Sequence, residues 1–241
     1  MRGNAIALAI GQLLLSSAAA AQHDSTPSLP PARHVPSWIV PLGIATAVAA
    51  DAEIREWTLQ HHSRSADRFA KPVNQLGTAR LLIPAMAVTY AGALLTDRRS
   101  LAAGVINTAG AYIASDLVEA TLKPVVGRER PHAGGNSHRF RPFTSDGDWH
   151  SFPSAHVAHI AAIATAISVQ SHSALVDALC DGVVGLVAAD RVYEDQHWTS
   201  DVAVTAALTA IVSRAAVRLV DSRLIHRHHV SAGTAAIPER R

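Results

Sequence analysis

The chain has 241 residues, of which 49% are hydrophobic and only 5% are aromatic, and its formal net charge is +2. This length allows one domain with a core of its own. The charge is too small and the basic residues are too scattered for a nucleic-acid-binding protein, so we expect no nucleic-acid partner. The hydrophobic excess is mostly alanine, and runs of Val, Ile, Thr and Tyr are scarce, which favours packed helices over sheets.

The N-terminus has the pattern of a secretory signal. Arg2 precedes an apolar run over residues 5–15, and a stretch of small residues ends in Ala-Ala-Ala before Gln22. We therefore expect a cleaved signal peptide at residues 1–21, with an uncleaved anchor or a buried first helix as the alternatives. Residues 22–37 contain four prolines and are expected to form a linker. The mature protein is then expected in the periplasm or cell envelope.

The rest of the chain predicts an all-α fold, a single bundle of about six to seven helices within one domain at residues 38–220. The expected helices, in chain order, are 38–61, 64–76, 79–96, 99–123, 154–171, 173–190 and 199–220. Pro153 precedes the fifth of them, where a proline suits the first turn of a helix. Residues 221–241 are basic and poor in apolar side chains, so we expect a disordered tail there.

The apolar stretches are short for membrane spans, which need about 20 apolar residues. Residues 81–96 and 100–115 are each 16 residues long without Asp, Glu, Lys or Arg. The longer stretch at residues 152–176 is interrupted by three histidines. We expect these helices to form the buried core of a soluble protein, for which any membrane contact is peripheral.

Two clusters of polar residues flank a long loop between Pro124 and Pro153, and a loop of this length inside a domain is often functional. The first cluster places the cations Lys123, Arg128 and Arg130 at the start of the loop. The second, residues 154–156, opens the next helix, where free backbone N–H groups and the helix dipole favour an anion. Taken alone, these clusters also fit a solvated basic turn and an ordinary serine cap.

The third cluster contains Arg191, His197 and Asp201. His197 and Asp201 are four residues apart, so on a helix they share one face. The carboxylate can then hold one ring nitrogen and leave the other free to attack a substrate. A surface His–Asp pair is the common alternative. Together, the three clusters describe an oxyanion cage with a nucleophile and a proton donor.

The spacing of these clusters resembles that of the type 2 phosphatidic acid phosphatase (PAP2) superfamily, which also contains bacterial class A acid phosphatases and vanadium haloperoxidases. The family pattern is K-x6-R-P, then P-S-G-H, then S-R-x5-H-x3-D. The matching residues are Lys123, Arg130, Pro131, Pro153, Ser154, His156, Arg191, His197 and Asp201. The chain departs from the pattern twice, with Ala155 in place of glycine and Asp190 in place of serine.

The resemblance implies a role for each residue. His197 is the nucleophile that forms a phosphohistidine, Asp201 orients it, and His156 protonates the leaving group and then activates water. The groups implied to bind the phosphate oxygens are Lys123, Arg130, Ser154, the amide of Ala155, and Arg191. Such a cage of cations and N–H donors needs no metal, so we expect neither a metal nor a cofactor.

The predicted function is hydrolysis of a phosphate monoester, or of a lipid phosphate or diphosphate. The sequence leaves open whether the substrate is soluble or lipidic, and what the oligomeric state is. One alternative is a vanadate-dependent haloperoxidase, in which vanadate is a cofactor instead of an inhibitor, although the chain is short for that activity. Another is a non-catalytic phosphate- or lipid-binding envelope protein. Ala155 and Asp190 favour it, whereas the intact His156, His197 and Asp201 disfavour it.

Overall fold

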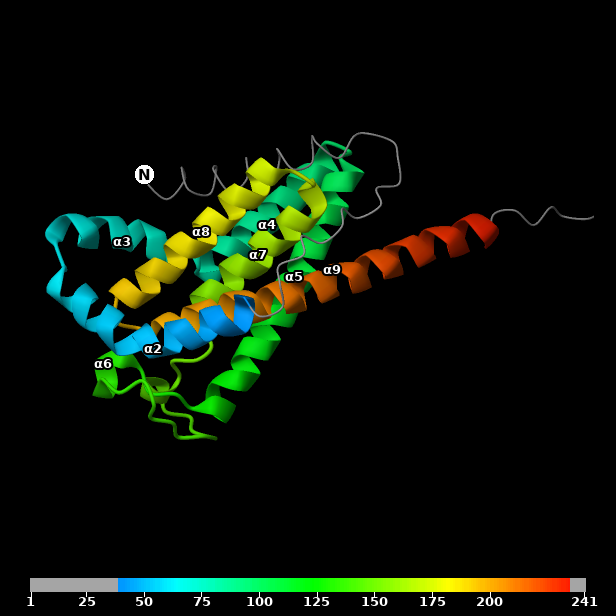
Figure 1. Ribbon diagram of the computed structural model, residues 1–241. Helices are drawn as coiled ribbons and strands as arrows, with labels where there is room; N and C mark the ends of the chain where they lie inside the picture. The colour runs from blue at the N-terminus through cyan, green and yellow to red at the C-terminus, as the bar shows by residue number, and fades with distance from the viewer. Residues whose placement is uncertain (1–38, 235–241) are drawn as a thin grey trace, which may run out of the picture.

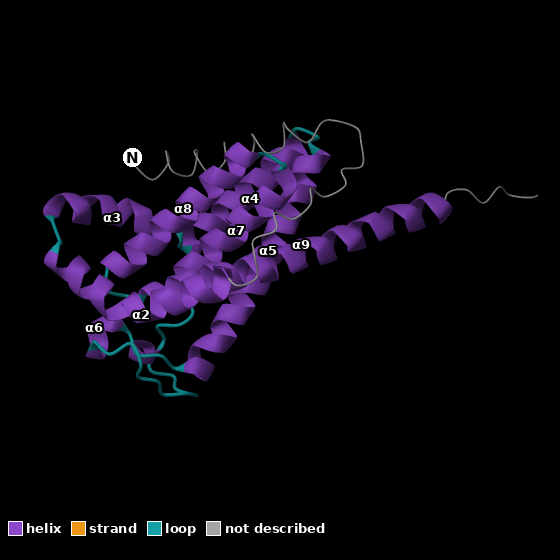
Figure 2. Cartoon of the chain, in the orientation of Figure 1, coloured by secondary structure: helices purple, strands orange, loops and turns teal. Residues whose placement is uncertain are grey.

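The computed structural model describes residues 39–234, with side chains over residues 42–222. The regular elements in this range are all helical (Figure 2), and the prediction of an all-α bundle is confirmed. They are α2 (Ile39–Gln60), α3 (Arg64–Leu76), α4 (Ala79–Leu95), α5 (Arg99–Val126), the single turn α6 (Pro131–Gly134), a 3₁₀ turn (Gly147–Trp149), α7 (Ala155–Ser171), α8 (Ala174–Tyr193) and α9 (Thr199–Thr234). The signal peptide and linker predicted at residues 1–37 lie outside the described residues.

Local sequence signals fix where the helices begin and end. The hydroxyl of Ser63 accepts a hydrogen bond from the backbone N–H of Ala66 at 3.2 Å and so caps α3. Helix α5 ends at Gly127, whose φ of +58° lies in the left-handed region. A Cβ at this position would lie 1.9 Å from the carbonyl oxygen of Arg141. Only glycine therefore allows the chain to turn here from α5 into the long loop.

Helix α7 is the centre of the bundle and packs against α5, α8 and α9 (Figure 1). Its many alanines allow close approach, and Val157, Ile160 and Ile163 are buried in the main core with Leu82 of α4. Burying an aliphatic side chain of this size contributes about 1.5–3 kcal/mol. The core therefore fixes the position of the α7 N-terminus, where residues 154–156 lie.

Helix α9 is longer than the sequence predicted, because it continues past residue 220 to Thr234. The side-chain amide of Asn107, on α5, donates to the carboxylate of Asp221 at 2.6 Å. This contact ties α9 to α5 at the point where the tail was expected to begin. Most of the predicted tail is thus helical, and residues 235–241 lie outside the described residues.

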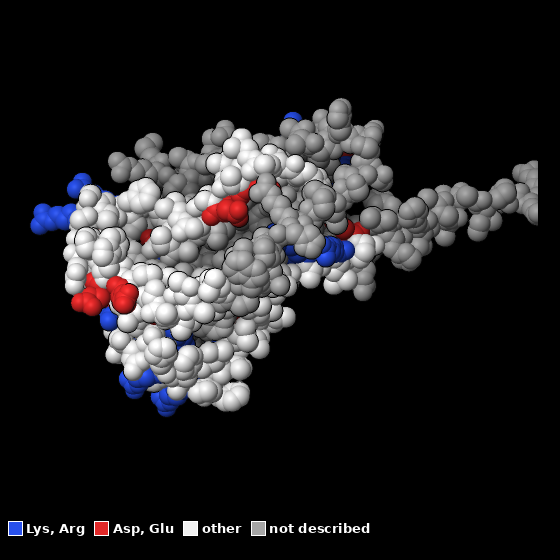
Figure 3. Space-filling view, viewed as in Figure 1, with Lys and Arg blue, Asp and Glu red and all other residues white. Residues whose placement is uncertain are grey.

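Two helices, α5 and the part of α9 over Thr199–Ser222, are long and apolar enough to cross a membrane. Helices α3 and α4, bent by 50° at their junction, pass the same test together. Large apolar side chains face outward, and Ile113 and Leu117 of α5 are 66% and 67% exposed. Most of the described surface in view carries no charge, and Lys and Arg lie in separate small groups at its lower end, its left end and right of its centre (Figure 3).

The expectation of a soluble protein is therefore wrong, and the helices have the features of an integral membrane protein. In the sequence, Asp116 and Glu119 end the uncharged stretch of α5 after 16 residues, which is shorter than the roughly 20 residues that a membrane span needs. In the folded chain, Glu119 is buried and pairs with Lys123, while Asp116 accepts from His159 of α7 at 2.9 Å. Polar groups of a spanning helix are tolerated when they pair with partners, as these do, although the Asp116 side chain stays 51% exposed.

Candidate active site

His197 lies in the turn between α8 and α9 and is buried. Its Nδ1–H donates to the carbonyl oxygen of Ser151 at 2.5 Å, so Nε2 carries the free lone pair. Burial, assisted by the nearby charge of Arg130, lowers the pKa of His197 well below its usual value. The ring is therefore neutral at pH 7, which is the form in which an imidazole acts as a nucleophile.

Asp201 is connected to His197 through Ser151 and does not bind the imidazole itself. Its Oδ2 accepts from the Ser151 hydroxyl at 2.5 Å and from the backbone N–H of Trp198 at 3.0 Å. The sequence predicted a direct contact between Asp201 and His197 on one helix face. That geometry does not occur, because His197 precedes α9 and only Asp201 belongs to its first turn.

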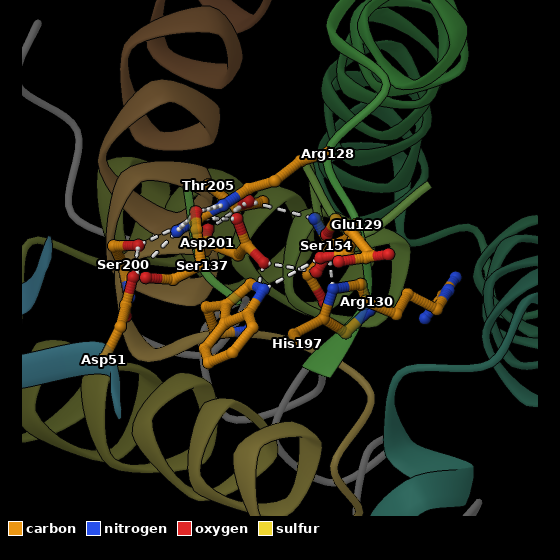
Figure 4. Close-up of polar contacts among 12 residues, drawn as sticks. Asp51, Arg128, Glu129, Arg130, Ser137, Ser154, His197, Ser200, Asp201 and Thr205 are labelled. Atoms are coloured by element: carbon orange, nitrogen blue, oxygen red, sulfur yellow. Dashed lines mark hydrogen bonds and ion pairs between the residues drawn. The ribbon is translucent and has the colours of Figure 1, made fainter. Parts of the chain in front are cut away.

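Arg128 binds Asp201, and its guanidinium points away from that of Arg130 (Figure 4). It is buried and donates to Asp201 at 2.6 Å, to Asp51 of α2 at 2.8 Å and to the Ser200 hydroxyl at 2.8 Å. The carbonyl of Ser137 accepts two further bonds, at 3.0 and 2.8 Å. A guanidinium paired with two buried carboxylates in this way joins α2, the loop and α9 into one rigid unit.

Arg130 forms hydrogen bonds with the turn that follows α8 and with the 3₁₀ turn of the loop. The Arg130 guanidinium donates to the carbonyl oxygen of Gln196 at 3.0 Å and to that of Gly147 at 3.0 Å. Burial lowers the pKa of Arg130, although the group stays charged at any physiological pH. The loop thereby places a cation next to the residue that precedes His197.

The three predicted phosphate-binding cations act on both histidines. The charges of Lys123, Arg130 and Arg191 contribute to lowering the pKa values of His156 and His197. For His156, burial is the largest cause and Arg191 the second, and its pKa falls to about 4. One positive potential therefore covers both rings, as expected of a site prepared for an anion.

Two of these cations already have acidic partners. Lys123 pairs with Glu119, one turn earlier on α5. Arg191 is buried, and its Nε donates to Asp190 at 2.9 Å. Asp190 is one of the two departures from the family pattern, and it holds the neighbouring guanidinium. An anion entering the site therefore competes with two carboxylates.

The start of α7 offers a donor that no protein group uses. Ser154 is fully buried, and its hydroxyl has no hydrogen-bond partner within residues 42–222. Its backbone N–H is occupied by the Thr205 hydroxyl at 3.0 Å. Ala155 is the first residue of α7. A free hydroxyl beside a helix N-terminus suits an anion that comes to this position.

A second histidine on α7 was not predicted as part of the site. His159 is buried, and its two ring nitrogens contact the carbonyl oxygen of Gly77 at 3.0 Å and the carboxylate of Asp116 at 2.9 Å. A Cβ at Gly77 would lie only 2.6 Å from the Cβ of His156. The turn between α3 and α4 therefore presses directly on His156, which no local pattern could reveal.

Two of the three histidines of the loop contact backbone oxygens through their rings. His132 Nδ1 lies 3.1 Å from the Asp195 carbonyl, and His150 Nε2 lies 2.9 Å from the Thr144 carbonyl. Within the described residues, no group of three or more His, Cys, Asp or Glu side chains has a geometry that could hold a metal ion.

The PAP2 superfamily model matches residues 104–225, about half of the chain. The chain belongs to the PAP2 superfamily. The matched segment contains all three clusters predicted to form the phosphate cage. It leaves out α2, from which Asp51 reaches Arg128, so that this ion pair lies partly outside the family match.

Two solved structures share the PAP2 fold. One is the transmembrane PAP2 type phosphatidylglycerolphosphate phosphatase from Bacillus subtilis, with 20% identity and a TM-score of 0.59 over 77% of this chain and 96% of that one. The other is LpxE from Aquifex aeolicus, with 21% identity and a TM-score of 0.56 over 70% of this chain and 94% of that one. No curated protein sequence matches this chain.

Proposed function

We propose that this PAP2 protein is a phosphatase that hydrolyses a lipid phosphate through a phosphohistidine on His197, without a metal. Members of the superfamily are phosphatases. The observation that carries the proposal is the state of His197, a buried neutral ring with Nδ1–H bound to Ser151 and Nε2 free. The charges of Arg130, Lys123 and Arg191 all help to lower the pKa of this ring and so keep it neutral.

In the first step, Nε2 of His197 attacks phosphorus and the bond from phosphorus to the leaving oxygen breaks. Protonated His156 gives its proton to that oxygen, so an alcohol departs. The pKa of His156 is about 4 in the empty site because burial and the cations disfavour its charge. A phosphate dianion offsets the cations and raises this pKa, so that substrate binding itself prepares the acid.

In the second step, the phosphohistidine is hydrolysed. His156, now neutral, takes a proton from water, and the resulting hydroxide attacks phosphorus. The phosphorus–nitrogen bond breaks and His197 is free again. His156 carries the proton while phosphate is bound and releases it when phosphate leaves, because its pKa then returns to about 4. His156 therefore acts first as the general acid and then as the general base.

The cage acts by charge and position. Lys123, Arg130 and Arg191 neutralise the non-bridging oxygens, and the unpaired hydroxyl of Ser154 donates one further hydrogen bond. The amide of Ala155 is the remaining donor at the start of α7. Phosphoryl transfer needs mainly such positioning and charge stabilisation. Glu119 and Asp190 give up their partners when phosphate enters.

A lipid phosphate is the favoured substrate because the helices that carry the site expose large apolar side chains, among them Ile113 and Leu117 of α5. Helices α5 and α9 are long enough to span a bilayer, and Lys123 lies in the last turn of α5. The cage therefore lies near the end of a candidate span, at the depth of a lipid headgroup. The similar protein from Bacillus subtilis is named for a lipid phosphate.

The test is phosphate release by the full-length protein in detergent, with phosphatidic acid and a small aryl phosphate compared side by side. His197→Asn should abolish both activities, whereas His138→Asn, an exposed loop histidine, should leave them unchanged. Activity should persist in a chelator and be inhibited by orthovanadate. Loss of activity in chelator with recovery on adding zinc or magnesium would contradict the mechanism. Bromide oxidation with vanadate and peroxide, without phosphatase activity, would favour the haloperoxidase alternative.

A further inference from the structure

The turn that carries His197 contains a residue with a strained backbone. Asp195, two residues before His197, has a φ of +54°, in the left-handed region. Aspartate and asparagine enter this region more readily than most residues, yet it remains costly for any residue except glycine. Strained backbone persists only where the surrounding structure holds it, and it is often found at functional sites. Neighbouring contacts must therefore hold Asp195 in this conformation.

Arg55 of α2 binds the side chain of this residue. Its Nε donates to Oδ1 of Asp195 at 2.7 Å, and its Nη2 donates to Oδ2 at 2.9 Å. A guanidinium that binds both carboxylate oxygens fixes the orientation of its partner as well as the distance. The two side chains are only 26% and 17% exposed, so solvent screens the pair less than it screens a surface ion pair. The pair joins α2 to a turn that lies 140 residues later in the chain.

The short helix α6 contacts the backbone of the same residue. The carbonyl oxygen of Asp195 accepts from the backbone N–H of His132 at 3.3 Å and lies 3.1 Å from Nδ1 of that histidine. Gly135, which ends α6 with a φ of +70°, approaches Arg55 so closely that a Cβ there would lie 3.1 Å from Nη1. Asp195 is therefore held at its side chain by α2 and at its carbonyl by the loop.

The conformation of Asp195 determines the direction of the next two residues. The backbone N–H groups of Gln196 and His197 both donate to the carbonyl oxygen of Arg191, at 3.1 and 3.3 Å. The backbone and side-chain oxygens of Gln196 accept from Arg130 at 3.0 and 3.2 Å. The chain that leaves Asp195 thus contacts a predicted phosphate-binding cation first and then carries the predicted nucleophile.

We propose that Arg55 is a positioning residue of this phosphatase, which binds Asp195 and so holds the turn in the left-handed conformation that places His197 and Gln196. The proposal rests on the proposed function, because the role of His197 as nucleophile belongs to it. Arg55 acts through Asp195. The family model matches residues 104–225, so the family pattern does not include Arg55.

Hydrogen exchange provides a test that does not depend on activity. The full-length protein in detergent is compared with Arg55→Met by mass spectrometry of a peptide that contains residues 194–198. The amides of Gln196 and His197 should exchange about tenfold faster in Arg55→Met, because the turn opens more often without the ion pair. Arg64→Met, on an exposed arginine at the start of α3, removes the same charge and should leave this exchange unchanged.

Variants then show whether the backbone conformation is what the ion pair maintains. Asp195→Ala and Asp195→Gly both remove the carboxylate, but only glycine adopts a positive φ at little cost. We expect kcat for a lipid phosphate to fall about ten- to a hundredfold in Arg55→Met and Asp195→Ala, the cost of a small misplacement of a catalytic group, and less in Asp195→Gly. Adding Arg55→Met to Asp195→Gly should cause no further loss, because the partner is already absent. Arg55→Lys keeps the charge without the planar fork, so its kcat should be intermediate.

Two results would overturn the proposal. Unchanged exchange of residues 194–198 in Arg55→Met would show that Arg55 does not hold the turn, and equal kcat in Asp195→Ala and Asp195→Gly would show that the left-handed conformation is not what the pair maintains. If thermal unfolding shows that Arg55→Met does not fold, Arg55→Lys and the two Asp195 variants decide the same questions. Faster exchange in Arg55→Met, together with no phosphatase activity in the parent protein, would contradict the proposed function and still support the role of Arg55 in holding the turn.

Discussion

The carbonyl oxygen of Ser151 accepts a hydrogen bond from Nδ1 of His197 at 2.5 Å, and the hydroxyl of the same serine donates to Asp201 at 2.5 Å. A backbone carbonyl fixes the ring orientation and the tautomer, and the carboxylate fixes the serine. The orientation of the nucleophile is therefore set in two steps, of which only the second involves Asp201.

Ser151→Ala tests this relay. The variant keeps the carbonyl that holds His197 but loses the bond to Asp201, so we expect kcat to fall about tenfold with KM little changed, the cost of one hydrogen bond to a charged group. Steady-state kinetics with a lipid phosphate measure kcat and KM separately. The control is Ser145→Ala, an exposed serine of the same loop. An unchanged kcat in Ser151→Ala would show that the hydroxyl has no part in positioning His197.

Arg128 is expected to be essential for stability. Arg128→Met leaves the buried carboxylates of Asp51 and Asp201 without their cation, and breaking a buried pair typically costs about 3–5 kcal/mol. Thermal unfolding in detergent should show a large drop in midpoint. Arg99→Met provides the comparison, because Arg99 and its partner Asp97 are 90% and 83% exposed, and an ion pair at the surface contributes about 0–1 kcal/mol. Equal midpoints for the two variants would be inconsistent with a buried network.

Substitutions of His197 and of His156 should have different kinetic effects. His197→Ala should abolish turnover of every substrate, because no nucleophile remains. His156→Ala should slow an alkyl phosphate about 10²–10⁴-fold, the usual contribution of general acid–base catalysis. With an aryl phosphate, whose leaving group needs no proton, phosphorylation should continue while hydrolysis slows. Mass spectrometry should then find phosphate trapped on His197, and a trapped phosphate elsewhere would disprove the assignment.

Stability should decrease in acid because of His156. Its pKa is about 4 in the folded protein and near 6.5 in the unfolded chain, so the unfolded state binds the proton first as pH falls. The stabilisation is complete above pH 6.5 and is lost progressively as the pH falls towards 4. His156→Gln should therefore lose less stability than the parent across this window. The comparison is made by thermal unfolding at several pH values, and parallel curves would refute it.

The sequence by itself determined the helices and the three clusters that we propose as the phosphate cage. The predicted helices at 154–171 and 173–190 correspond to α7 (Ala155–Ser171) and α8 (Ala174–Tyr193), because apolar spacing and caps act over a few residues. The three clusters could be found for a similar reason. Each is a short run of polar residues at a helix end, and their spacing matches the family pattern.

The tertiary structure decided what each residue contacts. Asp51 reaches Arg128 from a different helix, and Ser151 stands between Asp201 and His197. No spacing along the chain encodes such contacts. The membrane character was also misjudged from sequence, because the acidic residues of α5 interrupt its apolar run in linear order, whereas in the folded chain Glu119 pairs with Lys123 and Asp116 pairs with His159 of α7. The sequence gives the order of residues along the chain. Which side chains are buried and which face solvent or lipid depends on how all the helices pack, because residues far apart in the chain cover one another.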